Sequence, residues 1–285
     1  KYNLSKKSAF TLGAGLHSQM QPLDVYFYKE LMPDGQYNES NTQLGFTRSW
    51  HTVLAYDFQP ADDWRIKTEI YYQHLFNVPV SSRPGSFSML NSGASFQPNN
   101  ETDLQNTGTG RNYGLELTIE KFLSKGYYGL LTGSLYQSKY TGSDGIERNT
   151  AFNGRYVTNL LLGKEFSVGK EKQHRLFADL KVSVAGGRNY TPVDLAASQM
   201  QNQQVLLGDD FAFTQRNEDY FRMDFRAGFT HNSRKRKLSH SFYFDIQNLT
   251  NHKNVFAQRY NPVTRSVNTA YQIGLFPNFT YKLQF

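Results

Sequence analysis

The last fifteen residues of the chain, 271–285, read YQIGLFPNFTYKLQF and alternate in polarity. Every second residue from Tyr271 to Phe285 is apolar or aromatic, Pro277 included, whereas the residues between them are mostly polar. Because successive side chains of a β-strand point to opposite faces, this period of two predicts a strand over 271–285. Such an apolar strand would promote aggregation in water, but the outer face of a membrane barrel contacts lipid. The pattern therefore favours a membrane barrel over the alternative, the last strand of a soluble sandwich.

The composition of the whole chain is compatible with a barrel. Hydrophobic residues make up 38% of the 285 residues and charged residues 19%, while 22 Phe and 19 Tyr raise the aromatic share to 15%. A barrel needs only one apolar residue in two and carries aromatic girdles, so a mean hydropathy of −0.62 does not exclude a membrane. The sequence has no run of about 18 apolar residues and opens with no apolar signal peptide. We therefore expect a mature product or a fragment of an exported protein.

The cysteine count, the net charge and the spacing of the histidines limit the kinds of site that the chain can form. The chain contains no Cys, which excludes disulfides and thiolate metal sites. The net charge is +7, but the only dense basic run, 234–237, lies between two strand patterns and is typical of a solvated turn. No stacking or helical motif accompanies this run, so we do not expect nucleic-acid binding. The seven His show no spacing with carboxylates that is typical of a metal site, and we expect no metal and no cofactor.

Alternating segments recur along the chain and predict about ten strands. The predicted strands cover about 8–19, 43–58, 64–78, 111–123, 127–140, 154–166, 174–186, 219–230, 238–249 and 271–285. Short turns and long loops alternate between these strands. The short turns are at about 59–63, 124–126, 167–173 and 232–237, and the long loops are at about 20–42, 79–110, 141–153, 187–218 and 250–268. In an antiparallel barrel this order puts all the short turns at one end and all the long loops at the other. We therefore predict an all-β fold, a transmembrane antiparallel β-barrel with short periplasmic turns and long extracellular loops.

Charged residues on the polar faces of the predicted strands indicate a wet interior. They would be costly facing lipid, whereas opposite charges inside a barrel can satisfy one another. We expect nine of them to face the lumen: Lys67, Glu69, Glu116, Glu120, Asp179, Lys181, Arg222, Asp224 and Arg226.

The chain also carries a set of specific motifs. They are GRNYGLELTIEK at 110–121, SDG at 143–145, RNT at 148–150, FNGRY at 152–156, GKEF at 163–166, AGGRNYTPVDL at 185–195, DIQNLTN at 245–251, GLFPNF at 274–279 and YKLQF at 281–285. Together they resemble the C-terminal part of the β-barrel of TonB-dependent outer-membrane receptors of the Bacteroidota. A weaker likeness runs back through 55–56, 69–72 and 78–80, so the resemblance covers most of the chain.

The resemblance implies a 22-stranded barrel with an N-terminal plug inside it and a TonB box that couples transport to the proton gradient of the inner membrane. This chain shows only about ten strands, with neither plug nor TonB box. We therefore expect residues 1–285 to be the C-terminal portion of such a barrel. A ten-stranded barrel closing by itself is less favoured, because these motifs belong to the larger barrel and an unpaired strand edge would be unsatisfied in lipid.

The same resemblance implies the location and the partners. We expect the outer membrane of a Gram-negative bacterium, with contacts to membrane lipid and lipopolysaccharide. The missing N-terminal barrel and plug segment would be a partner, as would the TonB complex through that segment. A surface lipoprotein or other envelope proteins are further expected partners.

The expected function is that of an importer that binds its substrate at the long loops, where recognition residues are usually found. Aromatic loop residues that can stack on a ligand are Tyr26, Phe27, Tyr28, Phe87, Tyr190 and Phe211, and packing between loops is the alternative role for each. A structural or partner-holding barrel without transport is one alternative function, and an outer-membrane enzyme is another. No Gly-x-Ser-x-Gly or His-Glu-x-x-His motif is present, so we do not expect an enzyme.

The end of the chain has an expected role of its own. Tyr281, Leu283 and the terminal Phe285 resemble the signal that the barrel-assembly machinery reads in outer-membrane proteins. These three residues are therefore predicted to act in assembly rather than in binding.

Overall fold

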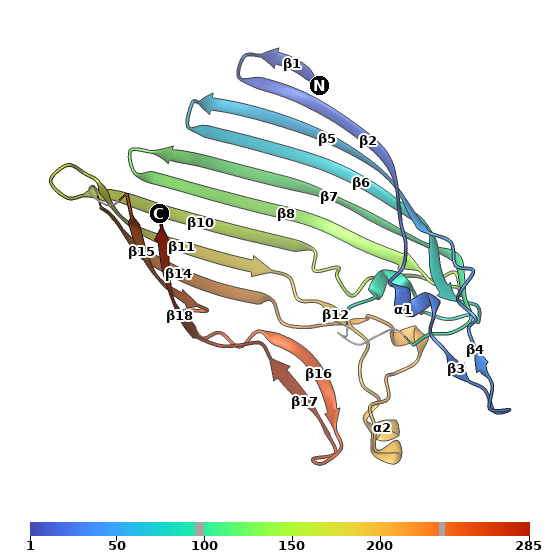
Figure 1. The fold of residues 1–285 in the computed structure, drawn as a ribbon. Helices are drawn as coiled ribbons and strands as arrows, with labels where there is room; N and C mark the ends of the chain where they lie inside the picture. The colour runs from blue at the N-terminus through green and yellow to red at the C-terminus, as the bar shows by residue number, and fades with distance from the viewer. Residues whose placement is uncertain (95–99, 234–236) are drawn as a thin grey trace.

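The computed structural model describes residues 1–94, 100–233 and 237–285 and consists mainly of one large antiparallel sheet (Figure 1). Most of the basic run at 234–237 therefore lies outside the described residues. The strands of this sheet are β1 (Tyr2–Ser5), β2 (Ser8–Gln19), β5 (Thr47–Ala61), β6 (Trp64–Ser81), β7 (Leu104–Ser124), β8 (Tyr127–Thr141), β9 (Glu147–Asn149), β10 (Tyr156–Val168), β11 (His174–Ala185), β14 (Tyr220–Asn232), β15 (Ser239–Gln247) and β18 (Phe276–Gln284).

Smaller elements lie between these strands. They are the strand pairs β3 (Glu30–Leu31) with β4 (Tyr37–Asn38), β12 (Asn189–Tyr190) with β13 (Gln215–Arg216) and β16 (Val255–Asn261) with β17 (Ser266–Tyr271), the α-helices α1 (Leu23–Tyr26) and α2 (Leu195–Gln201), and the 3-10 helices η1 (Met89–Asn91) and η2 (Asp209–Phe211). No helix in the described part of the chain is long and apolar enough to cross a membrane.

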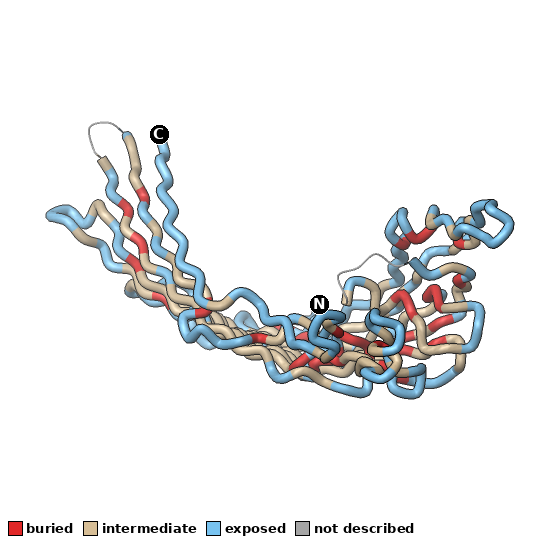
Figure 2. Tube along the Cα trace, turned by 90° about the horizontal axis from the view of Figure 1, so that it is seen from below, coloured by how far each residue is buried: buried red, intermediate tan, exposed pale blue. Residues whose placement is uncertain are grey.

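The sheet follows the order of the chain and is open at both edges. Its path runs β1-β2-β5-β6-β7-β8-β10-β11-β14-β15-β18, with β9 added to the end of β8. Within the described residues, β1 pairs only with β2 and β18 pairs only with β15. The sheet is strongly curved rather than flat (Figure 2). Each of the ten predicted strands is present, which confirms the all-β antiparallel fold of the barrel type, whereas β1 was not predicted.

The register of the sheet sorts the side chains onto two faces. One row of cross-strand partners consists of Leu12, Leu54, Ile70, Leu115 and Leu135, and another consists of Phe166, Leu176, Phe229, Phe242 and Tyr281. We call this side the apolar face. Leu12, Ile70 and Leu135 are 69%, 59% and 63% exposed, although each lies within a strand of the sheet. A broad face of exposed apolar side chains is unfavourable in water and is the expected surface toward lipid.

The opposite side, which we call the polar face, carries paired charges. Arg65 donates to Asp57 on the neighbouring strand at 2.5 Å. On β6 itself, Lys67 Nζ lies 2.8 Å from Glu69 Oε2. The register places all nine residues predicted to face a lumen on this side of the sheet. Opposite charges that lie this close largely cancel one another, so the paired residues make this face polar with little net charge of their own.

The connections at the two ends of the sheet differ in length. The tight connections β1–β2, β5–β6, β7–β8 and β10–β11 lie at one end, which we call the short-turn end and where the chain also ends. The helices and the small strand pairs lie at the other end, which we call the loop end (Figure 1). The predicted separation of turns from loops is therefore present in the fold.

The buried core of the molecule lies under the loops rather than between two sheets. Val25 of α1 packs with Val78, Met89 and Leu104, and these four side chains are between 0% and 8% exposed. Asn41, at 1% exposure, ties this core together because its side chain bonds Val25 O, Glu101 O and Leu104 N. A single curved sheet covers neither of its faces, so compact packing is available only where the loops fold onto one another.

The prediction of one continuous strand over 271–285 is wrong for its first five residues, 271–275. Tyr271 ends β17, and β18 begins only at Phe276. Between them, Gln272 N donates to Asn254 O at 2.8 Å, and Leu275 N donates to Asn251 Oδ1 at 3.0 Å. The backbone of 272–275 is thus bound to the preceding loop instead of to β15, and the alternation there does not mark a strand.

The two faces predict opposite results for neighbouring leucines of β8. Leu131 lies on the apolar face beside Ile119 and Leu160, whereas Leu130 lies on the polar face opposite Glu120. We expect Leu131→Arg to destabilise the full-length protein in a bilayer by about 2–4 kcal/mol, because a cation then faces lipid. Leu130→Arg is the matched control and should cost much less, since Glu120 can pair with it. Equal losses in a urea-unfolding series with lipid vesicles would contradict this assignment of the faces.

Candidate binding site at the loop end

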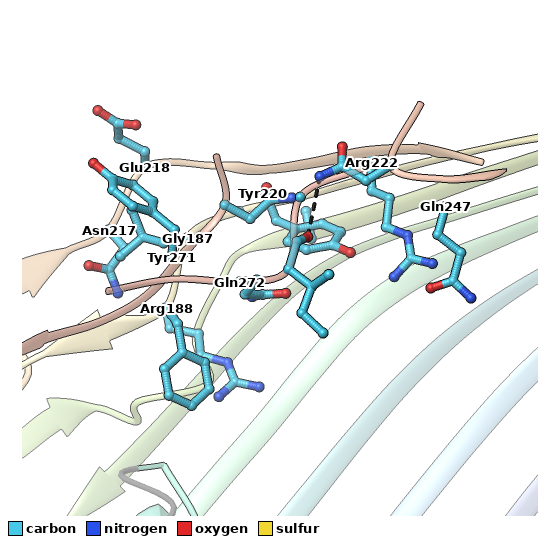
Figure 3. A pocket seen from close by; sticks show the side chains of 17 residues that line it. Gly187, Arg188, Asn217, Glu218, Tyr220, Arg222, Gln247, Tyr271 and Gln272 are labelled. Atoms are coloured by element: carbon cyan, nitrogen blue, oxygen red, sulfur yellow. Dashed lines mark hydrogen bonds between the residues drawn. The ribbon is translucent and has the colours of Figure 1, made fainter. Parts of the chain in front are cut away.

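A cavity of about 770 Å³ lies at the loop end, between the ends of β11, β14 and β15 and the segment that follows β17 (Figure 3). Its lining combines backbone and polar side chains with a few aromatic rings: Ala185, Gly186, Gly187, Arg188, Asn217, Glu218, Tyr220, Arg222, Gln247, Asn248, Asn254, Val255, Phe256, Tyr271, Gln272, Ile273 and Gly274. A few polar groups converging in a partly apolar hollow are typical of a small-molecule site.

Strands of the sheet position the polar groups of this cavity. Tyr220 and Arg222 lie two positions apart on β14, so both point to the polar face. Gln247 is the last residue of β15. Arg222 donates from Nε to Asp224 Oδ1 at 2.6 Å, which fixes the guanidinium. In Figure 3, Arg222 and Gln247 lie on one side of the view, while Glu218 lies on the other. The walls therefore offer the fixed guanidinium of Arg222 and the amide of Gln247 at one side, and the carboxylate of Glu218 at the other.

Asparagines fix the loop that closes the cavity. Asn254, which is 4% exposed, donates to Phe221 O at 2.8 Å and accepts from Phe221 N at 2.9 Å, as a neighbouring strand would. Asn248 lies 2% exposed with φ +50, and its side chain accepts from His252 N at 3.0 Å and donates to His252 O at 2.9 Å. Its own N–H donates to Asp224 Oδ1 at 2.8 Å. The DIQNLTN motif thus builds a closed turn on the end of β14.

Two adjacent glycines allow the chain to pass closely at the floor of the site. A Cβ at Gly186 would lie 1.7 Å from Gly154 O, and one at Gly187 would lie 1.9 Å from Asn217 O. No side chain fits at such distances, so this close approach requires glycine. Arg216 fastens the crossing, because it donates from Nη2 to Gly154 O at 2.9 Å and from Nε to Gly187 O at 3.2 Å.

One buried ion pair joins three loops, and one of them, the loop between β11 and β14, also lines the cavity. Arg148, whose side chain is 7% exposed, donates to both carboxylate oxygens of Asp144 at 2.9 and 2.6 Å. It also donates from Nε to Asp209 O at 3.2 Å, and Asp209 Oδ1 accepts from Ser86 Oγ at 2.5 Å. The hydrogen bonds from Arg148 hold the pKa of the Asp144 carboxyl below its usual value, and the Ile146 N–H at 3.0 Å adds to this. Loops far apart in the sequence are therefore held as one rim.

The aromatic loop residues predicted as ligand contacts do not come together at this cavity. Tyr26 is 8% exposed and accepts a bond from Gln21 N, while Phe87 packs against the core under the loops. Tyr28 and Tyr190 are half-buried, and Phe27 and Phe211 are 59% and 50% exposed. None of these six side chains lines the cavity. For Tyr26 and Phe87 the packing between loops is the role that the structure shows.

Among all the residues predicted as site residues, only Arg222 lines the cavity. Sequence reasoning missed Tyr220, Gln247 and Tyr271, which come from three separate strands. Tyr271 was expected on the apolar side of a terminal strand. The signal that was available is the AGGRN motif, which contributes four consecutive lining residues, 185–188. Within the described residues, no group of three or more His, Asp or Glu is arranged to hold a metal ion.

Comparison with known proteins identifies the fold. No protein-family model and no curated protein matches the sequence. The ferric yersiniabactin uptake receptor FyuA from Yersinia pestis matches at 15% identity and a TM-score of 0.60, over 100% of this chain and 36% of FyuA. The ferripyoverdine receptor of the outer membrane of Pseudomonas aeruginosa matches at 13% identity and 0.61, over 99% of this chain and 31% of the receptor. The outer membrane transporter YddB from Escherichia coli matches at 12% and 0.60, over 98% of this chain and 38% of YddB.

This chain has the β-barrel fold of outer-membrane receptors. At identities of 12–15% the likeness establishes the fold alone. The chain spans about a third of the length of each of these structures, with coverages of 31–38%. The solved structures it resembles are receptors and transporters rather than enzymes.

The pairing of Asn254 with the backbone of Phe221 gives a first prediction for the site. We expect Asn254→Ala to lower the stability of the loop that follows β15 by about 1–3 kcal/mol, because two buried backbone groups lose their partner. Hydrogen exchange at the Phe221 amide of the full-length protein should rise by the corresponding factor. Asn268→Ala on the exposed hairpin β16–β17 is the matched control and should leave this exchange unchanged. If Phe221 remains protected in Asn254→Ala, Asn254 does not hold the loop.

The Asp144–Arg148 pair gives a pH dependence with a defined sign. Because the pKa of Asp144 is lowered in the folded loop, its contribution is complete above the usual value of 3.8 and is lost as the pH falls through the lowered pKa. Exchange of the Ile146 amide, corrected for its intrinsic pH dependence, should therefore be constant from neutral pH to about 5 and accelerate below about 3.8.

Substitution of Asp144 tests the same pair at neutral pH. Asp144→Asn should weaken protection of Ile146 by about 1.5 kcal/mol or more and remove the acid step. Asp34→Asn is the control, since Asp34 makes the same turn bond to Gln36 N at 3.0 Å and no ion pair is found for it among the described residues. An acid step that persists in Asp144→Asn would assign the step to another group.

Proposed function

We propose that this chain forms part of the barrel of a TonB-dependent importer in the outer membrane of a Gram-negative bacterium. The observation that carries the proposal is the match of the whole sheet, with loops at one end and tight turns at the other, to outer-membrane receptors. The sequence motifs that resemble receptors of the Bacteroidota support the same assignment.

We further propose that residues 1–285 are the C-terminal portion of a 22-stranded barrel. Backbone N–H and C=O groups at an open sheet edge have no partner in lipid, so a membrane-spanning sheet must close. In the described residues the edges at β1 and β18 are unpaired and the curvature leaves them apart, which is consistent with further strands between them. Those strands and the plug would be the first partner of this chain, and the TonB complex would act through the plug segment.

In this arrangement the polar face lines the lumen and the apolar face contacts membrane lipid and lipopolysaccharide. Several charged residues of the polar face are held in pairs, as in Arg226 with Asp245 at 3.0 Å and Lys67 with Glu69 at 2.8 Å. A substrate passing along this wall meets polar groups whose charges are in part compensated. Tyr281, Leu283 and Phe285 would serve as the assembly signal, and a surface lipoprotein would meet the loop end.

The cavity at the loop end is the proposed place of substrate contact on this part of the barrel. It faces the polar side of the sheet and offers the guanidinium of Arg222, amide groups and the rings of Tyr220 and Tyr271. Such groups suit a polar ligand that accepts hydrogen bonds and also has flat or apolar surface. Two of the similar structures are a ferric yersiniabactin uptake receptor and a ferripyoverdine receptor bound to ferripyoverdine, so ferric complexes of this kind are the first ligands to test.

Uptake by intact cells tests the proposed function. Deletion of the full-length gene should abolish accumulation of one labelled nutrient, with ferric siderophores tried first, and the gene supplied in trans should restore it. Dissipating the proton gradient should stop uptake while surface binding remains. Arg188→Gln, at the cavity, should reduce binding, whereas Arg259→Gln on the exposed strand β16 should not. Unchanged growth and uptake on every nutrient tried would instead favour a structural barrel, and labelling by active-site-directed serine or metal probes would favour an enzyme.

A further inference from the structure

A second hollow, of about 620 Å³, lies on the apolar face of the sheet. Its residues extend over β7, β8, β10 and β11, with Trp64 of β6 and Phe225 of β14 at its two sides. Almost all of the surface that lines it is apolar, through side chains such as Leu131, Leu160 and Leu162. We call this hollow the outer groove.

Small residues create the outer groove at defined positions of the register. Gly129 pairs with Lys121 on one side and with Leu162 on the other, so one side chain is missing from this row. In the adjacent row Ala178 pairs with Lys164 and with Ala227. Two rows that carry large side chains on the other strands therefore have small residues at Gly129 and Ala178, and the surface is hollowed there. The groove extends over three rows, a length of about 13 Å along the strands.

A cation and aromatic rings lie at the end of the groove nearest the short-turn end. Lys164 donates from Nζ to Tyr127 Oη at 2.5 Å, and this Nζ lies 4.4 Å from the centre of the Tyr127 ring and 4.7 Å from that of Phe166. Lys121 Nζ is 5.7 Å from the Trp64 ring and is paired with the Asp63 carboxylate. No carboxylate pairs with Lys164 among the residues that the structure describes. The charge of Lys164 is therefore the one left uncompensated at the groove.

The position of Lys164 matches the edge of a bilayer. Lysine on the lipid side is unfavourable at the centre of a barrel and tolerated near the interfaces, where aromatic rings also gather. Lys164 lies four residues before the end of β10 at the short-turn end. An interfacial lysine alone would only extend into water. Here an apolar groove begins beside it and runs toward the centre of the sheet, which is the shape and charge pattern of a lipid molecule with an anionic headgroup.

We propose that the outer groove binds one anionic phospholipid of the periplasmic leaflet. The headgroup phosphate pairs with Lys164 and accepts from the Tyr127 hydroxyl, and the acyl chains lie over Gly129 on β8 and over Ala178 on β11, one on each side of β10. This proposal rests on the membrane placement proposed above but not on transport. The site is separate from the cavity at the loop end, since the two lie on opposite faces and share no residue.

Native mass spectrometry of the delipidated full-length protein in detergent tests this site. We expect one molecule of phosphatidylglycerol to be retained in clear preference to phosphatidylethanolamine. Lys164→Gln should weaken that retention about tenfold or more, because a charge-assisted bond is lost. Ala178→Leu keeps the cation but fills the groove and should weaken retention as well. Lys125→Gln in the tight turn of the same end is the matched control and should retain the lipid as the unchanged protein does.

Folding of each variant is checked by its heat-dependent migration on gels before the lipid is added. Equal retention of the two phospholipids, or unchanged retention in Lys164→Gln, would overturn the proposal. Displacement of phosphatidylglycerol by lipopolysaccharide would also overturn it, because the groove would then face the outer leaflet. The lipid site and the proposed transport function can fail separately. A variant that retains phosphatidylglycerol but no longer supports uptake, or one that supports uptake but no longer retains the lipid, distinguishes the two. A protein that stays monomeric without detergent would remove the membrane placement itself.

Discussion

The antiparallel hydrogen-bond ladder is the interaction on which the rest of this structure depends. A sheet one layer thick buries almost no side chains between its strands, so backbone pairing and the fixed register hold it together. Because side chains alternate with a period of two, a register kept across the whole path β2 to β18 gives every strand the same apolar and polar sides. The exposed apolar side chains of Leu12, Ile70 and Leu135 on one side, and the ion pairs on the other, follow from this one constraint.

The loop end depends on a different kind of bond. There the chain cannot repeat a ladder, and side-chain amides replace it: Asn41 joins α1 to β7, and Asn254 completes the edge of β14. Arg148 connects loops that lie more than fifty residues apart. The cavity is framed by the ends of strands and by the loop that Asn248 and Asn254 fix through specific polar contacts. Such a frame is preorganised, which reduces the entropy lost when a ligand binds.

The strands were predictable because their signal is local. Alternation is visible within about ten residues, and the ten predicted strands correspond to β2, β5, β6, β7, β8, β10, β11, β14, β15 and β18. The exception, 271–275, alternates as a strand does, but its backbone bonds to Asn251 and Asn254, which the local pattern does not reveal. The cavity was not predictable for the same reason, since Tyr220, Gln247 and Tyr271 meet only through the fold. Tyr26 and Phe87 looked like ligand contacts because sequence shows the type of a loop residue and not its packing.

The register, which shifts only toward the strand ends and is continuous through the middle of the sheet, also limits how such a chain can change over generations. One inserted or deleted residue inside a strand would exchange the two sides of everything after it until the next turn, and greasy side chains would then point into water. Length can therefore vary freely only where the ladder stops. The sheet therefore leaves its loops free to change in length while it restricts the lengths of its strands. New recognition can arise in the loops without any change to the architecture of the sheet.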